Sequence, residues 1–588
     1  MKQIELSSKN RWSRISRRNF LILTSGGLAL AGSRANAVNS LPDPTFITAK
    51  EINGSAPFMI ANPGQYVLAE DVNWNAPNAN ARAITIASDN VTFDFSGRTL
   101  RQSNKPKPIT EPDSNKRVCR GEVISGNVGV WVEGHKGITI KNGSVLNVQG
   151  VGIVTKDCHQ VDLLDLTVRN CGSNGVVDTS FLCRNGGIFV MGTKDKNNKI
   201  AFSSDIRIIN CVCSENTSQL DFVVTLGALA LFCDNLQVKD CVFNHTANTS
   251  PQPSGVQFNV VGIDFVICRN VLVEDCEAHD NTSGGEPAGF FAWGENYKFV
   301  RCRANRNYTL TGNRACGFNI STTNNLEMID CEADGNYNAN PNASSDDVKD
   351  FSATGYRLGR AVYRGLIENC RAIGNYSVGV NAPAAGFFLN SANHIVLKDC
   401  VAIGNRNASG TKLNNGFAAG FFASTTLPAP NGGFIGGEGN SFINCIADSN
   451  TVDQIPLFVQ SPAPPVDVGQ SIGNPQKGAG FLLIDQKNPR IVGCKTMNNK
   501  GKGIWLRGTS GALVEDNLLV DNNLYGIHDQ SPAGLNTYVS NEARLNGSSH
   551  ADNYVGLPLG TPVSMWTLNT PPKTSPLGRL ENTSISLR

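Results

Sequence analysis

The sequence has little charge and almost no excess of either sign. Its 588 residues include 51 Lys and Arg and 49 Asp and Glu, a formal charge of +2, and charged residues make up 17% of the chain. The usual share is ~25%. A nucleic-acid-binding protein needs a basic excess to neutralise phosphates, so no nucleic-acid partner is predicted. The composition also excludes a coiled coil and a highly charged disordered chain.

Motifs for several kinds of chemistry are lacking as well. The seven His residues show no His-Glu-x-x-His pattern, and Cys211-x-Cys213 is a weak metal signal. The sequence has no Gly-x-Ser-x-Gly, P-loop or dinucleotide fingerprint. Haem and nucleotide cofactors are therefore not predicted. No paired carboxylates stand out, whereas glycosidases usually need two.

Residues 1–37 are predicted to be a signal peptide. A basic segment precedes an apolar stretch from Phe20 to Ala31, which is too short for a membrane span, and Ala35-Asn-Ala37 fits a cleavage site. Ser16-Arg-Arg-Asn-Phe-Leu21 resembles the twin-arginine export motif, with Ile22 where a lysine often follows. An ordinary Sec signal is the alternative. We expect a periplasmic or secreted protein, with the twin-arginine machinery as export partner and no membrane span after signal removal.

The chain is rich in Gly (59) and Asn (66), which favour turns. One motif recurs, an apolar residue followed by x-x-Cys-x-small-x-x-Asn, with Cys and Asn always five residues apart. The clear copies are Cys276/Asn281, Cys302/Asn307, Cys331/Asn336, Cys370/Asn375, Cys400/Asn405, Cys445/Asn450 and Cys494/Asn499. Weaker copies are Asn142/Asn147, Asp165/Asn170, Cys211/Asn216, Cys241/Thr246, Asn517/Asn522 and Asn541/Asn546.

A short alternating strand that begins with Gly usually precedes each copy, as in Gly289-Phe-Phe-Ala and Gly386-Phe-Phe-Leu. The shortest repeat distances, from Asn142 to Asp165 and from Cys494 to Asn517, hold about three short strands and no helix. This pattern predicts an all-β fold, a right-handed parallel β-helix solenoid of about 13 coils, with like residues stacked ~4.8 Å apart. Asn would accept a left-handed backbone at a corner and bond from coil to coil.

Two other folds were weighed against this one. A leucine-rich repeat also has an Asn/Cys ladder, but its Leu-x-x-Leu-x-Leu frame is absent. A disulfide scaffold is disfavoured because the 17 Cys are odd in number and about half occupy one repeat position. Stacked thiols are therefore predicted to be unpaired and buried, while a bridge among the off-ladder Cys stays open. Those residues are Cys119, Cys158, Cys171, Cys183, Cys213, Cys233, Cys268 and Cys316.

Two segments resemble the pectate-lyase-like superfamily of bacterial β-helix repeat proteins. They are Gly64 to Leu100, with Asn90-Val-Thr-Phe-Asp-Phe-Ser-Gly-Arg-Thr-Leu100, and Gly137-Ile-Thr-Ile-Lys-Asn-Gly143. The resemblance covers about residues 60–550 and implies the fold. The superfamily includes polysaccharide lyases, glycoside hydrolases, uronate epimerases, esterases, adhesins and phage tailspikes, so fold does not fix function. We expect a cap at 38–83, the β-helix at 84–550 and a tail or cap at 551–588.

The second residue after the Gly should point outward. Down the chain this column contains Trp131, Val154, Phe189, Leu229, Asp264, Phe291, Asn319, Arg357, Phe388, Phe422, Leu482, Trp505 and His528. We predict an exposed aromatic track that binds polysaccharide, formed by Phe291, Trp293, Phe388, Phe422, Trp505 and His528. The alternatives are a second small core under the inserted loops and an oligomer interface.

The column becomes polar near its middle, at Asp264, Asn319 and Arg357. Uronate lyase or epimerase chemistry needs a group that neutralises the sugar carboxylate, a base for the C5 proton and a proton donor. We predict Arg357 as neutraliser or base, Asn319 as carboxylate binder and Asp264 as acid or calcium ligand. Structural salt bridges would also explain such a patch.

A second candidate site is His528, in Tyr525-Gly-Ile-His-Asp-Gln530. The segment resembles the Tyr-Gly-x-Asp-Pro-His signature of mannuronan epimerases, with Pro missing and His and Asp in reversed order. The residues that precede the ladder Cys alternate in charge at Asp275, Arg301 and Asp330, which predicts mutual pairing and leaves calcium open as a cofactor. Two functions follow. A solvent-open polar cluster would favour a polysaccharide lyase or epimerase, and a closed one a non-catalytic glycan-binding or envelope structural protein.

Overall fold

The structure is a computed structural model. It describes residues 43–54, 56–78, 80–104, 126–172, 183–219, 223–249, 260–340, 353–359, 362–378, 383–407, 418–425, 427–428, 434–435, 437–452, 478–532, 534–548, 553–556 and 564–566. Residues 1–37, predicted to be the signal, lie outside these ranges. Residues Pro44 to Arg588 form one compact unit, and the account below concerns this unit.

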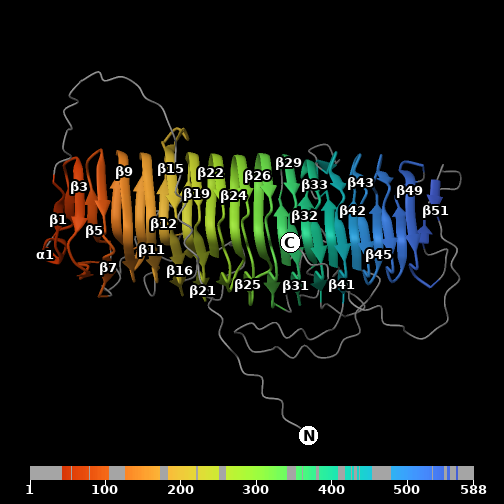
Figure 1. The fold of residues 1–588 in the computed structure, drawn as a ribbon, viewed down its shortest axis with the longest axis horizontal. Coiled ribbons are helices and arrows are strands. Elements are labelled where there is room, and N and C mark those ends of the chain that lie inside the picture. Colours follow the sequence, from red (N-terminus) through yellow and green to blue (C-terminus); the bar gives the residue numbers. More distant parts are fainter. Residues whose placement is uncertain are drawn as a thin grey trace, which may run out of the picture. The chain divides into compact units, whose positions relative to one another are not determined.

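Parallel strands stack side by side in chain order, from β1 to β51 (Figure 1). The first series, called the long sheet here, is paired from coil to coil and contains the Gly strands. Its members are β2 (Phe58–Ile60), β5 (Arg82–Ile86), β8 (Asn127–Glu133), β10 (Gly150–Lys156), β12 (Cys183–Met191), β18 (Val223–Leu231), β22 (Val260–Glu274), β24 (Pro287–Val300), β26 (Ala315–Ile329), β28 (Ala353–Leu358), β32 (Ala384–Asn390), β36 (Ala418–Ser424), β42 (Gly478–Ile484), β45 (Lys502–Arg507), β48 (Tyr525–Gln530) and β50 (Tyr554–Val555).

A second series of strands follows the first around each coil. It contains β1 (Thr45–Ile47), β3 (Gly64–Leu68), β6 (Val91–Asp94), β9 (Lys136–Leu146), β11 (His159–Arg169), β15 (Ser203–Ile209), β19 (Cys233–Lys239), the later halves of β22, β24 and β26, β29 (Tyr363–Glu368), β33 (Asn393–Lys398), β39 (Ser441–Ile443), β43 (Arg490–Val492), β46 (Leu513–Glu515), β49 (Thr537–Arg544) and β51 (Ser564–Trp566).

A third series and a short eight-stranded sheet complete the coils. The third series contains β4 (Val72–Trp74), β7 (Thr99–Gln102), β16 (Val212–Ser214), β20 (Val242–Asn244), β30 (Arg371–Ile373), β34 (Val401–Ile403), β40 (Ile446–Asp448), β44 (Lys495–Met497) and β47 (Leu518–Val520). The short sheet contains β17 (Thr217–Ser218), β21 (Ala247–Asn248), β23 (Thr282–Ser283), β25 (Tyr308–Thr309), β27 (Tyr337–Asn338), β31 (Tyr376–Ser377), β35 (Arg406–Asn407) and β41 (Thr451–Val452). These stacked parallel series are a β-helix, as the repeat predicted.

Parallel pairing is also present near both ends of the described chain. Parallel pairing already begins at β1 and β3, inside the range 38–83 predicted as a cap. That range also contains the one helix of the described residues, α1 (Ala49–Ile52), which buries Ile52. At the other end β50 still pairs with β48. The Gly-strand column therefore continues past the thirteen predicted positions, to Met59 and Thr85 on one side and Val555 on the other.

The Asn ladder forms the coil-to-coil hydrogen bonds that were predicted. Each Nδ2 donates to the next Oδ1, from Asn281 through Asn307, Asn336, Asn375, Asn405, Asn450, Asn499, Asn522 and Asn546 to Asn553, at 2.8–3.0 Å. The side chains are nearly or fully buried. The same amides bond to backbone groups, as Asn336 does to the Ala304 carbonyl at 3.1 Å. Buried amides need these partners, so the ladder fixes the corner of each coil.

A left-handed backbone is found at Asn147 (φ 60°) and Asn170 (φ 53°) of the early copies, as predicted, but not at the Asn of the later copies. There positive φ falls one residue earlier, at Asp280 (φ 58°) and Arg306 (φ 54°), and at Gly where the repeat has Gly335 or Gly374. The ladder Asn is selected by its amide bonds and not by a left-handed backbone. The early copy Asp165/Asn170 is also shifted by one residue relative to the ladder. The backbone N–H that donates to Asn216 Oδ1, at 3.0 Å, is that of Cys171 and not that of Asn170.

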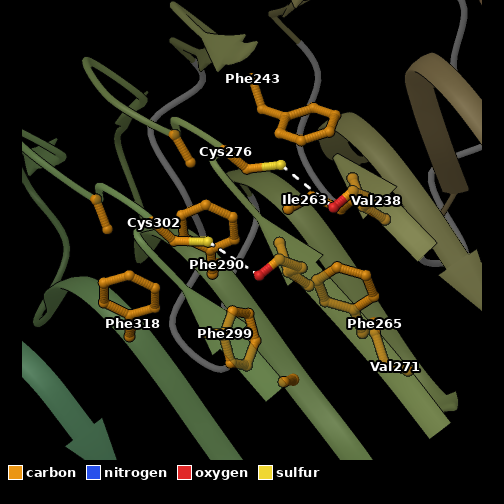
Figure 2. Packing of buried hydrophobic residues seen from close by; sticks show 14 of the residues in the cluster. Val238, Phe243, Ile263, Phe265, Val271, Cys276, Phe290, Phe299, Cys302 and Phe318 are labelled. Atoms are coloured by element: carbon orange, nitrogen blue, oxygen red, sulfur yellow. Dashed lines mark hydrogen bonds between the residues drawn. The ribbon is translucent and has the colours of Figure 1, made fainter. Parts of the chain in front are cut away.

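Inside the coils, aromatic rings stack in one column. Phe290, Phe318, Tyr356, Phe387, Phe421 and Phe481 lie with ring centroids 4.5–5.0 Å apart and planes within 9°. Figure 2 shows Phe290 and Phe318 beside Phe299, with the Cys276 and Cys302 thiols pointing into the same core. Each ring buries its apolar area against the rings of the coils above and below. The Gly strand therefore has nearly the same geometry in each of these coils.

The described thiols are free. Fifteen Cys are unpaired and buried, which confirms the prediction for the ladder. Cys119 and the side chain of Cys183 lie outside the described residues. Burial raises the pKa of thiols such as Cys171, to about 12. Among the described residues, no helix is long and apolar enough to cross a membrane.

Candidate functional site

The predicted outward column exists. All thirteen residues from Trp131 to His528 are register partners on successive strands of the long sheet. Their side chains lie outside the main core, on what we call the outer face. Reading alternation from the Gly therefore placed every residue on the correct side of the sheet.

The outer face is mostly closed, and this corrects the prediction of an exposed aromatic track. Phe388 and Phe422 are 0% exposed and stack with centroids 5.2 Å apart. They belong to an apolar cluster separate from the main core, with Ala385, Ala419, Ala479, Leu482 and Ile484. A second such cluster contains Trp131, Val154, Phe189 and Leu229. These rings form secondary cores, the alternative considered from the sequence.

The remaining predicted ligand-binding aromatics differ in exposure. Trp293 is 41% exposed, and Phe291 is half-buried against the second apolar cluster, that of Trp131 and Phe189. Trp505 and His528 are half-buried and lie with parallel rings, 6.2 Å between centroids. The Lys502 ammonium lies 3.3 Å from the Trp505 ring centroid, so part of that ring is already covered.

Lys502 was not predicted, although it immediately precedes the Gly of its strand. Burial lowers its pKa to about 8. Burial and the neighbouring Lys502 charge lower the pKa of His528 to about 4, so its imidazole is neutral at neutral pH. Tyr525 packs edge-on against His528 at 4.9 Å. The end of the outer face therefore holds a compact group of titratable side chains, separated from the polar middle by Phe388, Phe422 and Leu482.

Asn319 and Arg357 are brought together between the two apolar clusters. Arg357 Nη1 donates to Asn319 Oδ1 at 3.0 Å, and the two residues are 8% and 0% exposed. The Asn319 Nδ2 has no hydrogen-bond partner among the described residues. A guanidinium and an amide donor at one buried position can bind a carboxylate.

Asp264 lies farther away. Phe291 intervenes between Asp264 and Asn319 in the register, so the separation is ~10 Å at the normal strand spacing. Burial raises the pKa of Asp264 to about 6, against an opposing effect of Arg184. Its Oδ1 has no hydrogen-bond partner among the described residues. The three predicted catalytic residues therefore share a column but not a single contact site.

The structure adds an ion pair that the sequence reading missed. Glu286 and Arg314 lie three residues before the Gly, immediately ahead of the adjacent strands β24 and β26, with Oε2 and Nη1 3.5 Å apart. Between this pair and Arg357 lies Cys316, whose thiol accepts a hydrogen bond from Thr354 at 3.2 Å. Burial raises the pKa of Cys316, and the nearby charges of Arg357, Arg314 and Glu286 all act on it. Alternation read backwards from the Gly would have placed both charged residues inward, because the phase changes at the Gly: the residue before it, such as Ala288 or Cys316, lies in an outer-face cluster.

Of the charged residues that precede the ladder Cys, Asp275 and Arg301 form an ion pair, whereas Asp330 has a different partner. Arg301 contacts Asp275 at 2.7 and 2.8 Å, as predicted, and also Glu274 at 2.6 Å, which was not predicted. Asp330 instead accepts a hydrogen bond from Asn369 Nδ2 at 2.5 Å. Among the described residues, no group of three or more His, Cys, Asp or Glu side chains is placed to hold a metal ion.

Comparisons with known proteins agree with the fold. Residues 429–554 match a family described as "Right handed beta helix region". Among solved structures, the Azotobacter vinelandii mannuronan C-5 epimerase AlgE4 A-module is similar, with 10% identity over 87% of this chain and 99% of that chain and a TM-score of 0.32. The periplasmic alginate epimerase AlgG is similar at 10% identity over 89% and 83%, with a TM-score of 0.28.

A phage protein is similar as well. The Dettilon tailspike protein (gp208) has 12% identity over 84% of this chain and 63% of that chain, with a TM-score of 0.31. No curated protein matches. The stacked parallel strands and the matching family model together show that the fold is a right-handed parallel β-helix.

Proposed function

We propose that this chain is an exported protein that binds an acidic polysaccharide on the outer face, as a uronate polysaccharide lyase or epimerase. The observation that carries the proposal is the cluster of Arg357, Asn319, Arg314 and Glu286 between two apolar clusters. Charged groups are rarely buried without a role, and ionisable clusters of this kind gather at functional sites.

Each residue of the cluster has a role in this proposal. Arg357, Arg314 and the Asn319 amide bind the sugar carboxylate and stabilise the charge that develops when C5 loses its proton. Glu286 takes that proton. In a lyase the electron pair forms the C4–C5 double bond and expels the O4 leaving group, which takes up a proton. In an epimerase a proton returns to the opposite face of C5. Asp264 contacts the sugar farther along.

The test uses the mature protein with calcium and a panel of pectate, alginate and glycosaminoglycans. A lyase produces the ultraviolet absorbance of an unsaturated uronate on one polymer. R357A should abolish it, and N319A should reduce it ~100-fold. The control R306A removes an exposed Arg paired with Asp280 and should leave activity unchanged. Activity retained in R357A would overturn the assignment.

A second candidate is a non-catalytic glycan-binding or envelope structural protein. The observation that favours it is closure: Asn319, Asp264 and Arg357 are 0–8% exposed, and a closed polar cluster is what we expect of this second function from the sequence. Binding of a panel polymer with no change in its sugars would support the glycan-binding form. No binding at all would support the structural form.

Export is also part of the proposal. We expect R17K/R18K to leave the precursor in the cytoplasm, whereas a Sec signal would still be processed.

A further inference from the structure

The second series of strands has an outer face of its own, and it is hollowed near the N-terminal end. A cavity of about 320 Å³ lies over β3, β6, β9 and β11. Ligand pockets usually measure ~300–1,000 Å³. The cavity lies over a different series of strands from the Arg357 cluster and shares no residue with it.

The hollow follows one column of side chains. Gln65, Thr92, Thr139 and Asp162 are register partners on successive coils, and all four line the cavity. The two short Thr side chains occupy the middle of this column. In the following coils the same column carries Arg207, Gln237, Leu272, Lys298 and Glu327, none of which lines the cavity. Along this column the cavity therefore ends at Asp162.

The neutral polar groups of this groove are available to a ligand. Gln65, Thr92 and Thr139 are half-buried, and their side chains make no hydrogen bond with the described residues. They offer one amide and two hydroxyls, which both donate and accept. Their spacing along the coil axis is ~4.8 Å, close to the length of one sugar ring in an extended glycan.

The charges that line the groove compensate one another. Asp94 accepts bonds from Asn142 Nδ2 and the Ser96 N–H, and it lies 3.4 Å from the Lys141 ammonium. Asp162 binds Arg207 through two bonds of 2.6 Å. With two anions and two cations paired in place, the groove has no local excess of charge to attract a polyanion.

We propose that this groove is a second glycan-binding site, and that it takes a neutral polysaccharide lying along the coil axis. Gln65, Thr92, Thr139 and Lys141 bond to successive sugar hydroxyls. This site would hold the protein on a neutral or mixed polymer independently of what the Arg357 cluster does.

The test is calorimetric titration of the mature protein with neutral hexasaccharides of glucose and mannose of different linkages, and with oligouronates. We expect one neutral series to bind, and T139W to weaken its binding at least ~10-fold by filling the groove. The matched control Q237W places the same ring in the same column beyond the groove and should change binding less than about twofold. R357A should bind the neutral sugar normally, which separates this proposal from the previous one.

Thermal unfolding checks that each variant folds. If T139W does not fold, the triple variant Q65A/T92A/T139A replaces it and should also weaken binding at least ~10-fold. The proposal is overturned if no neutral hexasaccharide binds, if binding survives both variants, or if only oligouronates bind.

Discussion

Two adjacent columns of the long sheet behave very differently. The inner column repeats one aromatic shape, with Phe318, Tyr356 and Phe387 stacked at 4.5–5.0 Å. One residue farther along each strand, the outer column changes from Asn319 to Arg357 to Phe388. The inner side chains must fit neighbours on both sides of a closed coil, so their geometry is repeated. The outer side chains do not have to fit inside the closed coil, so this column can hold side chains as different as Asn319, Arg357 and Phe388.

The largest effect should come from interrupting the Asn ladder. N336A removes two donated bonds, to Asn375 and Ala304, and two accepted from Asn307, all at a fully buried position. Because the neighbours are left without partners, we expect a loss of about 4–5 kcal/mol in the free energy of unfolding. The exposed control N325G, whose positive φ suits Gly, should lose less than about 1 kcal/mol. Equal losses in denaturant titrations would contradict this account of the ladder.

The next prediction compares the two columns directly. F387A, on the inner side, and F388A, on the outer side, each remove a fully buried ring and should each cost about 3–4 kcal/mol. F388A should leave polysaccharide binding unchanged, because its ring lies in a secondary core. A stable F388A protein that no longer binds glycan would restore the aromatic track and break the distinction.

The Asp264 carboxyl should give the outer face its own pH dependence. Its pKa is raised to about 6, so the folded state holds its proton more tightly than the unfolded chain does. Stability should therefore fall between about pH 4 and pH 6, by about 3 kcal/mol in total, and then level off. D264N should remove this fall and be more stable than the wild type at pH 7. Unfolding curves with the same slope in both proteins would contradict the assignment.

The smallest effect should come from the exposed ion pairs. Arg301 is about half exposed, although it contacts both Asp275 and Glu274. Solvent and salt screen such pairs, so R301A should cost about 1 kcal/mol or less, and less still at high salt. A large loss that is insensitive to salt would show that these charges fix the register of the coils.

The repeated backbone of the coils could be predicted from the sequence, but the burial of the side chains on the outer face could not. The Cys-to-Asn spacing and the Gly strands gave the β-helix and the register of the outer column, because a solenoid repeats its local geometry. The same pattern could not show that Phe388 and Phe422 are buried, because alternation gives the side of the sheet and not the exposure of a side chain. Glu286, Arg314 and Lys502 could not be predicted by alternation, because they lie at odd offsets before the Gly, where the alternation changes phase. The coil-to-coil amide hydrogen bonds of the ladder Asn were predicted correctly, whereas in the later copies the left-handed backbone lies one residue earlier than predicted.

The most direct measurement of the central claim is the fate of the sugar C5 proton. Each polyuronate of the panel is incubated with the mature protein in D₂O and followed by proton NMR. A lyase removes the C5 proton and leaves a double bond, and an epimerase exchanges it for deuterium. We predict loss of the C5 signal from one polymer with the wild type and R306A, and none with R357A. Unchanged C5 signals in every polymer would contradict an enzymatic role for the buried Arg357 cluster.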